Sequence, residues 1–264
     1  MIIDGHSHVT LPLQKHIALM DQAGVDKTIL FSTTFHPELA KNVQEVKEKM
    51  NYLEDLLSGK KGSMMEAKKI SVTELVSAIK QYPTRYIGFG AVPAGLSLQD
   101  TMQYLDENIL SNNLAGIGEF TLGAGQAHLL EVIFQAVQNL KKMPIWIHAF
   151  HPYTLQDIKE TASMAKLFPE IPVILGHLGG LNWLETMDIV AETSNLYLDT
   201  SASYSTLVLS TVINAIPEKC IFGVDLPFGD LEISKQVILK YAKTSAAANA
   251  VLGGNISKIL NLSL

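Results

Sequence analysis

Short apolar runs alternate with longer helical patterns along the whole chain, and this alternation constrains the fold more than any other feature. Eight runs rich in β-branched or aromatic residues predict strands at 2–6, 28–33, 86–92, 115–120, 144–149, 173–177, 196–200 and 220–225. A strand followed by a helix, repeated, predicts parallel strands with right-handed crossovers. Eight repeats within 264 residues favour a closed (β/α)8 barrel over an open doubly wound sheet, which would also need a G-x-G-x-x-G motif after its first strand. We therefore predict a single α/β barrel domain that spans residues 1–264.

Composition limits the classes of partner. The net charge of -6 argues against nucleic acid, since binding to phosphates calls for a basic surface. No apolar run reaches the roughly 18 residues of a membrane span, and the chain starts with a strand pattern rather than a charged signal peptide. We expect a soluble, cytoplasmic protein with a small-molecule substrate, either a monomer or a homo-oligomer. The lone cysteine, Cys220, lies in an apolar run, which predicts a buried thiol.

Potential metal ligands lie at the ends of several predicted strands. His6 and His8 follow the first apolar run, and residues two apart on a strand share a face, so both imidazoles can reach one ion. Later runs end in four more candidate ligands: Glu119, His148, His177 and Asp225. Barrel active sites form at the carboxyl ends of the strands, where side chains from different strands converge. The sequence therefore predicts a metal site at that end of the barrel.

The motifs around these residues resemble the amidohydrolase superfamily, in particular its amidohydrolase-related branch. The motifs are Asp4-Gly5-His6-Ser7-His8, the single His148, Gly176-His177-Leu178-Gly179-Gly180, Asp225, and a late Leu252-Gly253-Gly254-Asn255 that opens a final helix. The resemblance covers nearly the whole chain. It implies a distorted metal-dependent barrel with one or two divalent ions, most commonly Zn²⁺. The implied reaction is hydrolysis of an amide or ester bond or, in some members, non-oxidative decarboxylation.

The resemblance also implies a role for each candidate. His6, His8 and His148 would be metal ligands, and Asp225 would be both a ligand and the base that deprotonates the attacking water. His177 would bind a second ion or orient the water. These roles agree with general chemistry, because a metal lowers the pKa of its water to about 7 and an adjacent carboxylate can take the proton.

Glu119 decides whether the site holds one ion or two. In Gly116-Ile117-Gly118-Glu119 it resembles the glutamate that bridges two metals in some members of the superfamily. Structural roles stay open as alternatives: Glu119 could bind a backbone amide or a lysine, His177 could be a core histidine, and Asp225 could cap the helix beginning near Leu231. Without Glu119, the remaining ligands predict a mononuclear site.

The other histidines divide into two groups. His16 and His128 fall in helical stretches, where we expect solvated surface residues, whereas His36 and His151 follow strands on the active-site face and could touch the substrate. The same loops carry further candidates for substrate contact: Phe35, Phe150, Tyr153, Asn182, Trp183, Tyr204 and Phe228.

Residues 35–85 form an unusually long connection between the second and third predicted strands. Helical patterns cover residues 38–57 and continue to Ile79, with a glycine-containing joint near Gly59 and Gly62. We expect a helical cap over the barrel mouth, with a plain surface elaboration as the alternative.

The single arginine, Arg85, precedes the third predicted strand and should lie at the opposite end of the barrel from the metal site. Since arginine is the usual bidentate partner of carboxylates and phosphates, a polyanionic substrate is disfavoured. We therefore predict a metal-dependent hydrolase acting on a small amide, lactone or ester. The alternatives are a metal-dependent decarboxylase of a small carboxylic acid, and an inactive barrel that serves as a binding protein.

Overall fold

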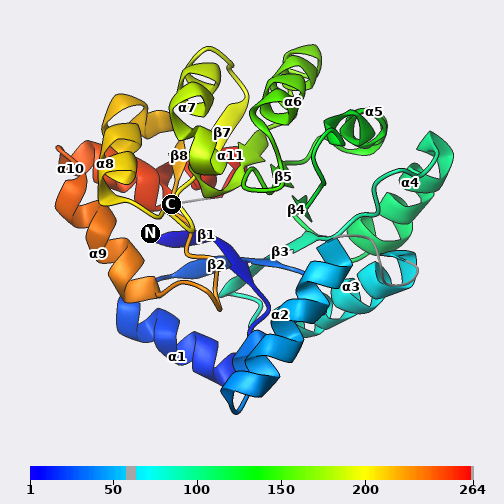
Figure 1. The fold of residues 1–264 in the computed structure, drawn as a ribbon, viewed down its shortest axis with the longest axis horizontal. Coiled ribbons are helices and arrows are strands. Elements are labelled where there is room, and N and C mark those ends of the chain that lie inside the picture. The colour runs from blue at the N-terminus through cyan, green and yellow to red at the C-terminus, as the bar shows by residue number, and fades with distance from the viewer. Residues whose placement is uncertain (58–63, 263–264) are drawn as a thin grey trace.

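The computed structural model describes residues 1–57 and 64–262, and its strands confirm the predicted barrel (Figure 1). Eight strands form one sheet in sequence order, and neighbouring strands run parallel. Each overlaps a predicted run, although β1 ends later and β8 ends earlier than predicted: β1 (Ile3–His8), β2 (Lys27–Phe31), β3 (Tyr86–Gly90), β4 (Gly116–Phe120), β5 (Ile145–Ile147), β6 (Val173–Leu175), β7 (Leu196–Asp199) and β8 (Cys220–Ile221). The residues after β8 complete the barrel against β1, because Gly5 N donates to Phe222 O (2.7 Å) and Val224 N donates to His6 O (3.1 Å).

Helices surround the strands in Figure 1. They are α1 (Leu13–Ala23), α2 (Val43–Leu57), α3 (Met64–Gln81), α4 (Leu98–Tyr104), α5 (Leu130–Leu140), α6 (Leu155–Leu167), α7 (Trp183–Ala191), α8 (Thr206–Ala215), α9 (Leu231–Tyr241), α10 (Ser245–Asn249) and α11 (Asn255–Ile259). Within the described ranges, none of the helices is both long and apolar enough to cross a membrane.

Large apolar side chains fill the barrel interior and leave one end for polar groups. Ile29, Phe31, Phe89 and Trp146 belong to this interior cluster, and Ile256 of α11 packs against it. The segment that leads into α11 lies against the start of β1, since a side chain at Gly253 would meet Met1 O. The amino-terminal end of the barrel is thus covered, and the polar site lies at the carboxyl end.

Register shifts in two strands turn metal-ligand candidates inward. Strict alternation would place His6 on the same side of β1 as Asp4, and Glu119 on the same outward side of β4 as Ile117. The pairing of β1 shifts between Asp4 and Ser7, and that of β4 shifts between Ile117 and Phe120. Such bulges re-aim side chains, and here they bring His6 and Glu119 into the barrel mouth.

The long connection after β2 divides into two parts. Helix α3 packs on the barrel as an ordinary crossover helix, with Val72, Leu75 and Ala78 buried. Helix α2 is more exposed, and it is preceded by a short 3-10 turn, Pro37–Leu39, where the sequence predicts the start of a helix. The more exposed part of residues 35–85 is therefore α2 with this turn, and the role of the connection as a cap over the barrel mouth stays a prediction. The predicted joint at Gly59 and Gly62 lies outside the described residues.

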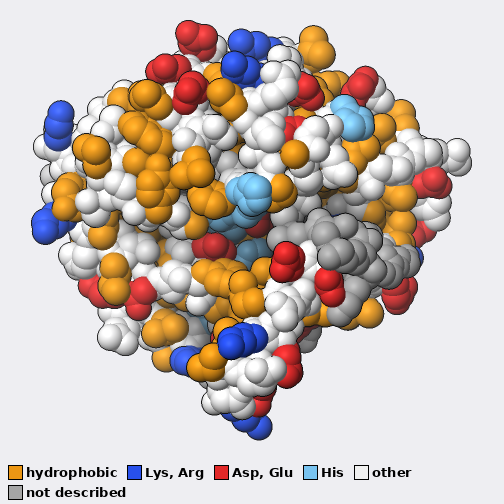
Figure 2. Space-filling view, viewed as in Figure 1, with side chains coloured by type: hydrophobic (Ala, Val, Ile, Leu, Met, Phe, Trp, Pro, Cys, Tyr) orange, Lys and Arg blue, Asp and Glu red, His pale blue; other side chains and the backbone are white. Residues whose placement is uncertain are grey.

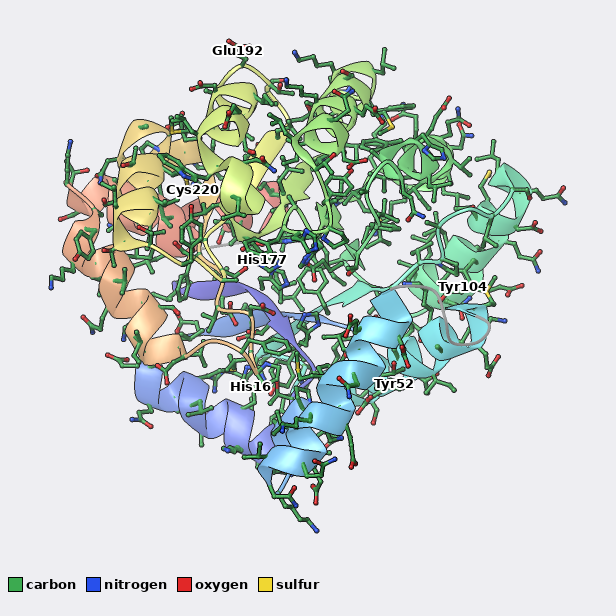
Figure 3. The ribbon with its side chains drawn as sticks, viewed as in Figure 1. His16, Tyr52, Tyr104, His177, Glu192 and Cys220 are labelled. Atoms are coloured by element: carbon green, nitrogen blue, oxygen red, sulfur yellow. The ribbon has the colours of Figure 1, made fainter. Side chains whose placement is uncertain are left out.

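Three other predictions have clear outcomes. Cys220 is fully buried, as expected. Arg85 binds Asp21 and the carbonyl of Asp26 near the amino-terminal ends of the strands, away from the polar site. The expectation for His16 is wrong: it is 1% exposed, and its ring lies 5.4 Å from that of Tyr86 on β3. Figure 3 labels His16, which belongs to α1.

Candidate metal centre

The candidate ligands converge at the carboxyl end of the barrel in two groups of three. The first group is His6, His8 and Asp225, which come from the two ends of the chain. Asp225 Oδ1 lies 3.4 Å from His8 Nε2 and 4.0 Å from His6 Nε2. This arrangement matches the convergence predicted for the ends of β1 and β8.

The second group is Glu119, His148 and His177. Glu119 Oε1 lies 3.1 Å from His148 Nδ1 and 3.2 Å from His177 Nε2. The two imidazole nitrogens are themselves 3.0 Å apart. In Figure 3, His177 lies at the centre of the ring of strands, beside clustered nitrogen atoms. All six predicted ligands are therefore close together.

Glu119 faces both groups with different oxygens. While Oε1 contacts the second group, Oε2 lies 3.5 Å from His6 Nε2 and 3.8 Å from His8 Nε2 of the first. Its side chain is only 8% exposed. Glu119 thus has the geometry of a carboxylate that could bridge two cations, and the structure shows no backbone amide or lysine as its partner among the described residues.

Buried imidazole nitrogens point into this cluster. His6 is fully buried and its Nδ1 binds Asp199, whereas its Nε2 has no hydrogen-bond partner among the described residues. A buried polar atom without a partner is costly, and imidazole nitrogen and carboxylate oxygen are common ligands of divalent ions. The donor set therefore fits a divalent metal.

The charges of the site also favour a divalent metal. Burial lowers the pKa of His6, but the negative charges of Asp199 and Glu119 oppose it and hold that pKa well above its ordinary value. Burial raises the pKa of Glu119, yet the charges of His6 and His148 bring it well below its usual range. The buried carboxylates thus require nearby positive charge, which a divalent cation can supply in place of protonated imidazoles.

Backbone strain occurs at two of the predicted catalytic residues. His177 has φ 60° and Asp225 has φ 64°, in the left-handed region that non-glycine residues rarely adopt. Such conformations are frequent at functional sites. Asp225 does not cap α9, because Asp230 is the cap residue, so the alternative structural role proposed for Asp225 is wrong.

The sequence analysis missed two polar residues that hydrogen-bond to the candidate ligands. Asp199 ends β7, and its carboxylate binds His6; Ser201 follows two residues later and binds His177. Both are buried. The sequence did contain a signal for Asp199. It lies near the end of the seventh predicted strand, and this position places it at the carboxyl end of the barrel.

Two cavities are formed by loops on the same face. One, of about 330 Å³, lies between α2 and the loop after β2 and is lined by His36 and Tyr52 among others. The other, of about 250 Å³, is lined by His151, Leu181 and Asn182. Both His36 and His151 therefore lie on the predicted face, whereas Tyr153 is buried with its hydroxyl bound to Thr161.

Apolar side chains border the polar centre. Figure 2 shows histidine and acidic side chains in a hollow with hydrophobic side chains around it. Exposed apolar residues follow several strands on this side: Leu39, Leu181, Tyr204, Leu207 and Phe228. Phe228 stacks on Phe35, with ring centroids 6.4 Å apart.

Comparisons with solved structures find barrels of the same fold. A 2,6-dihydroxybenzoate decarboxylase from Rhizobium is 17% identical, with 99% of this chain and 98% of that chain covered and a TM-score of 0.68. A dihydroxybenzoic acid decarboxylase from Polaromonas sp. JS666, solved with bound manganese and 2-nitroresorcinol, is 16% identical, with 99% and 97% covered and a TM-score of 0.70. A 4-oxalomesaconate hydratase from Rhodopseudomonas palustris is 15% identical, with 99% and 96% covered and a TM-score of 0.68. At these identities the likeness shows the fold alone.

Comparison with protein families gives a more specific result. No curated protein matches the chain. The amidohydrolase family model, however, matches residues 3–262, which is nearly the whole chain. Since the match includes every strand of the barrel and every candidate ligand, the chain belongs to the amidohydrolase family of enzymes.

Proposed function

We propose that this enzyme is a hydrolase that uses two divalent metal ions to cleave a small, neutral amide, lactone or ester. The observation that carries the proposal is the position of Glu119, whose two oxygens face different pairs of imidazoles. A carboxylate between two cations offsets part of their repulsion, so this geometry supports two ions rather than one. Two ions together can activate a water molecule and polarise the bond that is cleaved.

The protein residues divide the remaining work. His6, His8 and Asp225 would hold one ion, and His148 and His177 the other, with Glu119 between them. Asp225 is also the proposed base, which takes a proton from the attacking water and returns it to the leaving group. Four imidazole ligands suit Zn²⁺, which we propose as the resident ion.

The rim of the site supports a neutral substrate with an apolar portion. Apolar residues such as Tyr204 and Phe228 are exposed there, and binding pockets commonly use such groups for affinity and a few polar groups for orientation. The only arginine, Arg85, is engaged near the other end of the barrel, so it cannot bind an anionic substrate group.

Metal content tests the proposal most directly. We expect about two ions per chain in the wild type by elemental analysis, and a loss of at least one in Glu119→Gln, because the amide lacks the bridging charge. Glu131→Gln is the matched control, since Glu131 is exposed on α5 and bonds only to Gln135 among the described residues. If the wild type contained a single ion, and Glu119→Gln bound that ion with wild-type affinity, the two-ion site would be contradicted.

Decarboxylation of a small carboxylic acid is the second candidate, favoured by the likeness to two decarboxylases. The metal-loaded enzyme should be assayed against amides, lactones and esters in ¹⁸O-labelled water, and against aromatic carboxylic acids for release of carbon dioxide. Label in the product supports hydrolysis. Carbon dioxide release without hydrolysis would replace our proposal with the second candidate.

A further inference from the structure

Asp199 lies beneath the ligands at the end of β7 and is completely buried. Its Oδ2 accepts hydrogen bonds from His6 Nδ1 and from Trp146 Nε1, each 2.8 Å away. Its Oδ1 accepts from Ser201 N (2.8 Å), from His177 N (3.3 Å) and from the Ser201 hydroxyl. Both oxygens therefore have at least two donors.

Because both of its oxygens already accept hydrogen bonds, Asp199 differs from the candidate metal ligands. His6, His177 and Asp199 lie close enough together to hold an ion, but the donors already around the carboxylate leave it no free direction toward one. His6 instead presents its unpartnered Nε2 to Glu119 and Asp225. Because Nδ1 carries the proton donated to Asp199, the lone pair of Nε2 is free to bind a metal.

Ser201 orients an imidazole of the second group in the same way. Its hydroxyl has one proton, which it donates to Asp199, and its oxygen lies 2.9 Å from His177 Nδ1. That oxygen can then only accept, from His177 Nδ1–H and more weakly from His6 Nδ1–H, which is 3.3 Å away and closer to Asp199. In the neutral ring, the lone pair of His177 then lies on Nε2, which is 3.2 Å from Glu119 Oε1.

We propose that Asp199 and Ser201 are positioning residues that fix which nitrogen of His6 and of His177 faces the metal ions. Asp199 acts on His6 directly and on His177 through Ser201, so one carboxylate orients a ligand in each group. This inference rests on the proposed two-ion site.

Metal affinity of two variants tests it. In Asp199→Asn, both ions should bind 10- to 100-fold more weakly, the usual effect of removing such a partner. In Ser201→Ala, binding of the ion held by His148 and His177 should weaken more than binding of the other ion, because the shorter bond from His6 to Asp199 remains. Metal-free proteins would be titrated with Zn²⁺ against a chelator, and with Co²⁺, whose visible absorption reports the ligand geometry.

Asp230→Asn serves as the control, because Asp230 is an exposed helix cap and asparagine caps equally well. The melting temperature of each metal-free variant shows whether it folds. If Asp199→Asn does not fold, Ser201→Ala alone tests the inference. Wild-type affinity for both ions in the folded variants would overturn the inference while leaving the two-ion site intact. If the wild type itself bound fewer than two ions, the proposed function would fail first.

Discussion

Asp225 joins an unusual backbone conformation to the chemistry proposed for the site. Its φ of 64° is one that asparagine also tolerates, so Asp225→Asn should fold normally while lacking a basic carboxylate. We expect kcat to fall by at least about 10²-fold, as is typical for loss of a general base. Rates must be compared at saturating metal, because Asp225 is also a proposed ligand. Near wild-type turnover in the fully loaded variant would assign the base to another residue.

Because His16 is buried, we expect the free energy of unfolding to depend on pH. Burial and the charge of Arg85 lower its pKa to about 4, whereas it is about 6.5 in the unfolded chain. Folding therefore favours the neutral ring, and its stability contribution is complete above pH 6.5 and declines as the pH falls toward 4. Between pH 8 and pH 5 the loss should be about 2 kcal/mol.

Urea unfolding of the wild type and of His16→Leu measures this loss. The leucine variant should lose less stability than the wild type over that range, while His128→Leu, a change at an exposed histidine, should follow the wild type. Parallel pH profiles for the wild type and His16→Leu would show that His16 contributes nothing to acid sensitivity.

Among single residues, the sequence marked the candidate ligands by motif, but it did not mark the residues that hydrogen-bond to them. His16 was predictable as a buried residue, because it lies three residues after Leu13 and four before Met20, on the buried face of α1. Asp199 ended a predicted strand but had no motif to mark it. Its role depends on His6 and Ser201, which are brought to it only by closure of the barrel.

Among the elements, the eight strands followed from periodicity, but the register did not. Whether Glu119 faces inward or outward depends on a bulge between Ile117 and Phe120, and a shift of one residue reverses the side on which a side chain lies. The connection after β2 shows a similar limit. Its length was evident from the sequence, but the packing of α3 on the barrel through Leu75 was not.

His36 links residues 35–57, the predicted cap segment, to the barrel and should make the stability of this segment depend on pH. Its Nδ1 lies 3.1 Å from Glu38 and its Nε2 lies 3.1 Å from Glu74, while Glu38 also accepts from Leu11 N. Hydrogen bonds to the two glutamates raise the pKa of His36 to about 9. The stabilisation is therefore complete below pH 6.5 and is lost as the pH rises through 9. Other charged groups border the adjacent cavity: Glu45, Glu48 and Lys49.

Hydrogen exchange of residues 35–57 measures the effect. After correction for intrinsic rates, we expect protection to fall between pH 6.5 and pH 9.5 in the wild type and to be low at both values in His36→Gln. Peptides from α9 provide an internal control. Protection that is unchanged by pH and by the substitution would mean that the cap is held by other contacts.

For the molecule as a whole, the proposed ions connect segments that are far apart in the chain. Their ligands come from β1, β4 and the residues that follow β5, β6 and β8, so one site joins His6 to Asp225 across the barrel mouth. A ligand that binds only the folded state stabilises it by about 4 kcal/mol at 1,000 times its Kd. Removal of metal should therefore lower the stability of the entire barrel.

Thermal unfolding before and after chelation tests this coupling. For a protein of this size we expect Tm to fall on the order of 10 °C when the metal is removed, and to recover when Zn²⁺ is added back. The double variant His6→Ala, His8→Ala should keep its fold, since the interior core is formed by apolar residues, but should contain less metal and respond less to chelation. Stoichiometric metal in that variant, with an unchanged response to chelation, would show that the ions bind elsewhere, because the first ligand group would have lost both of its imidazoles.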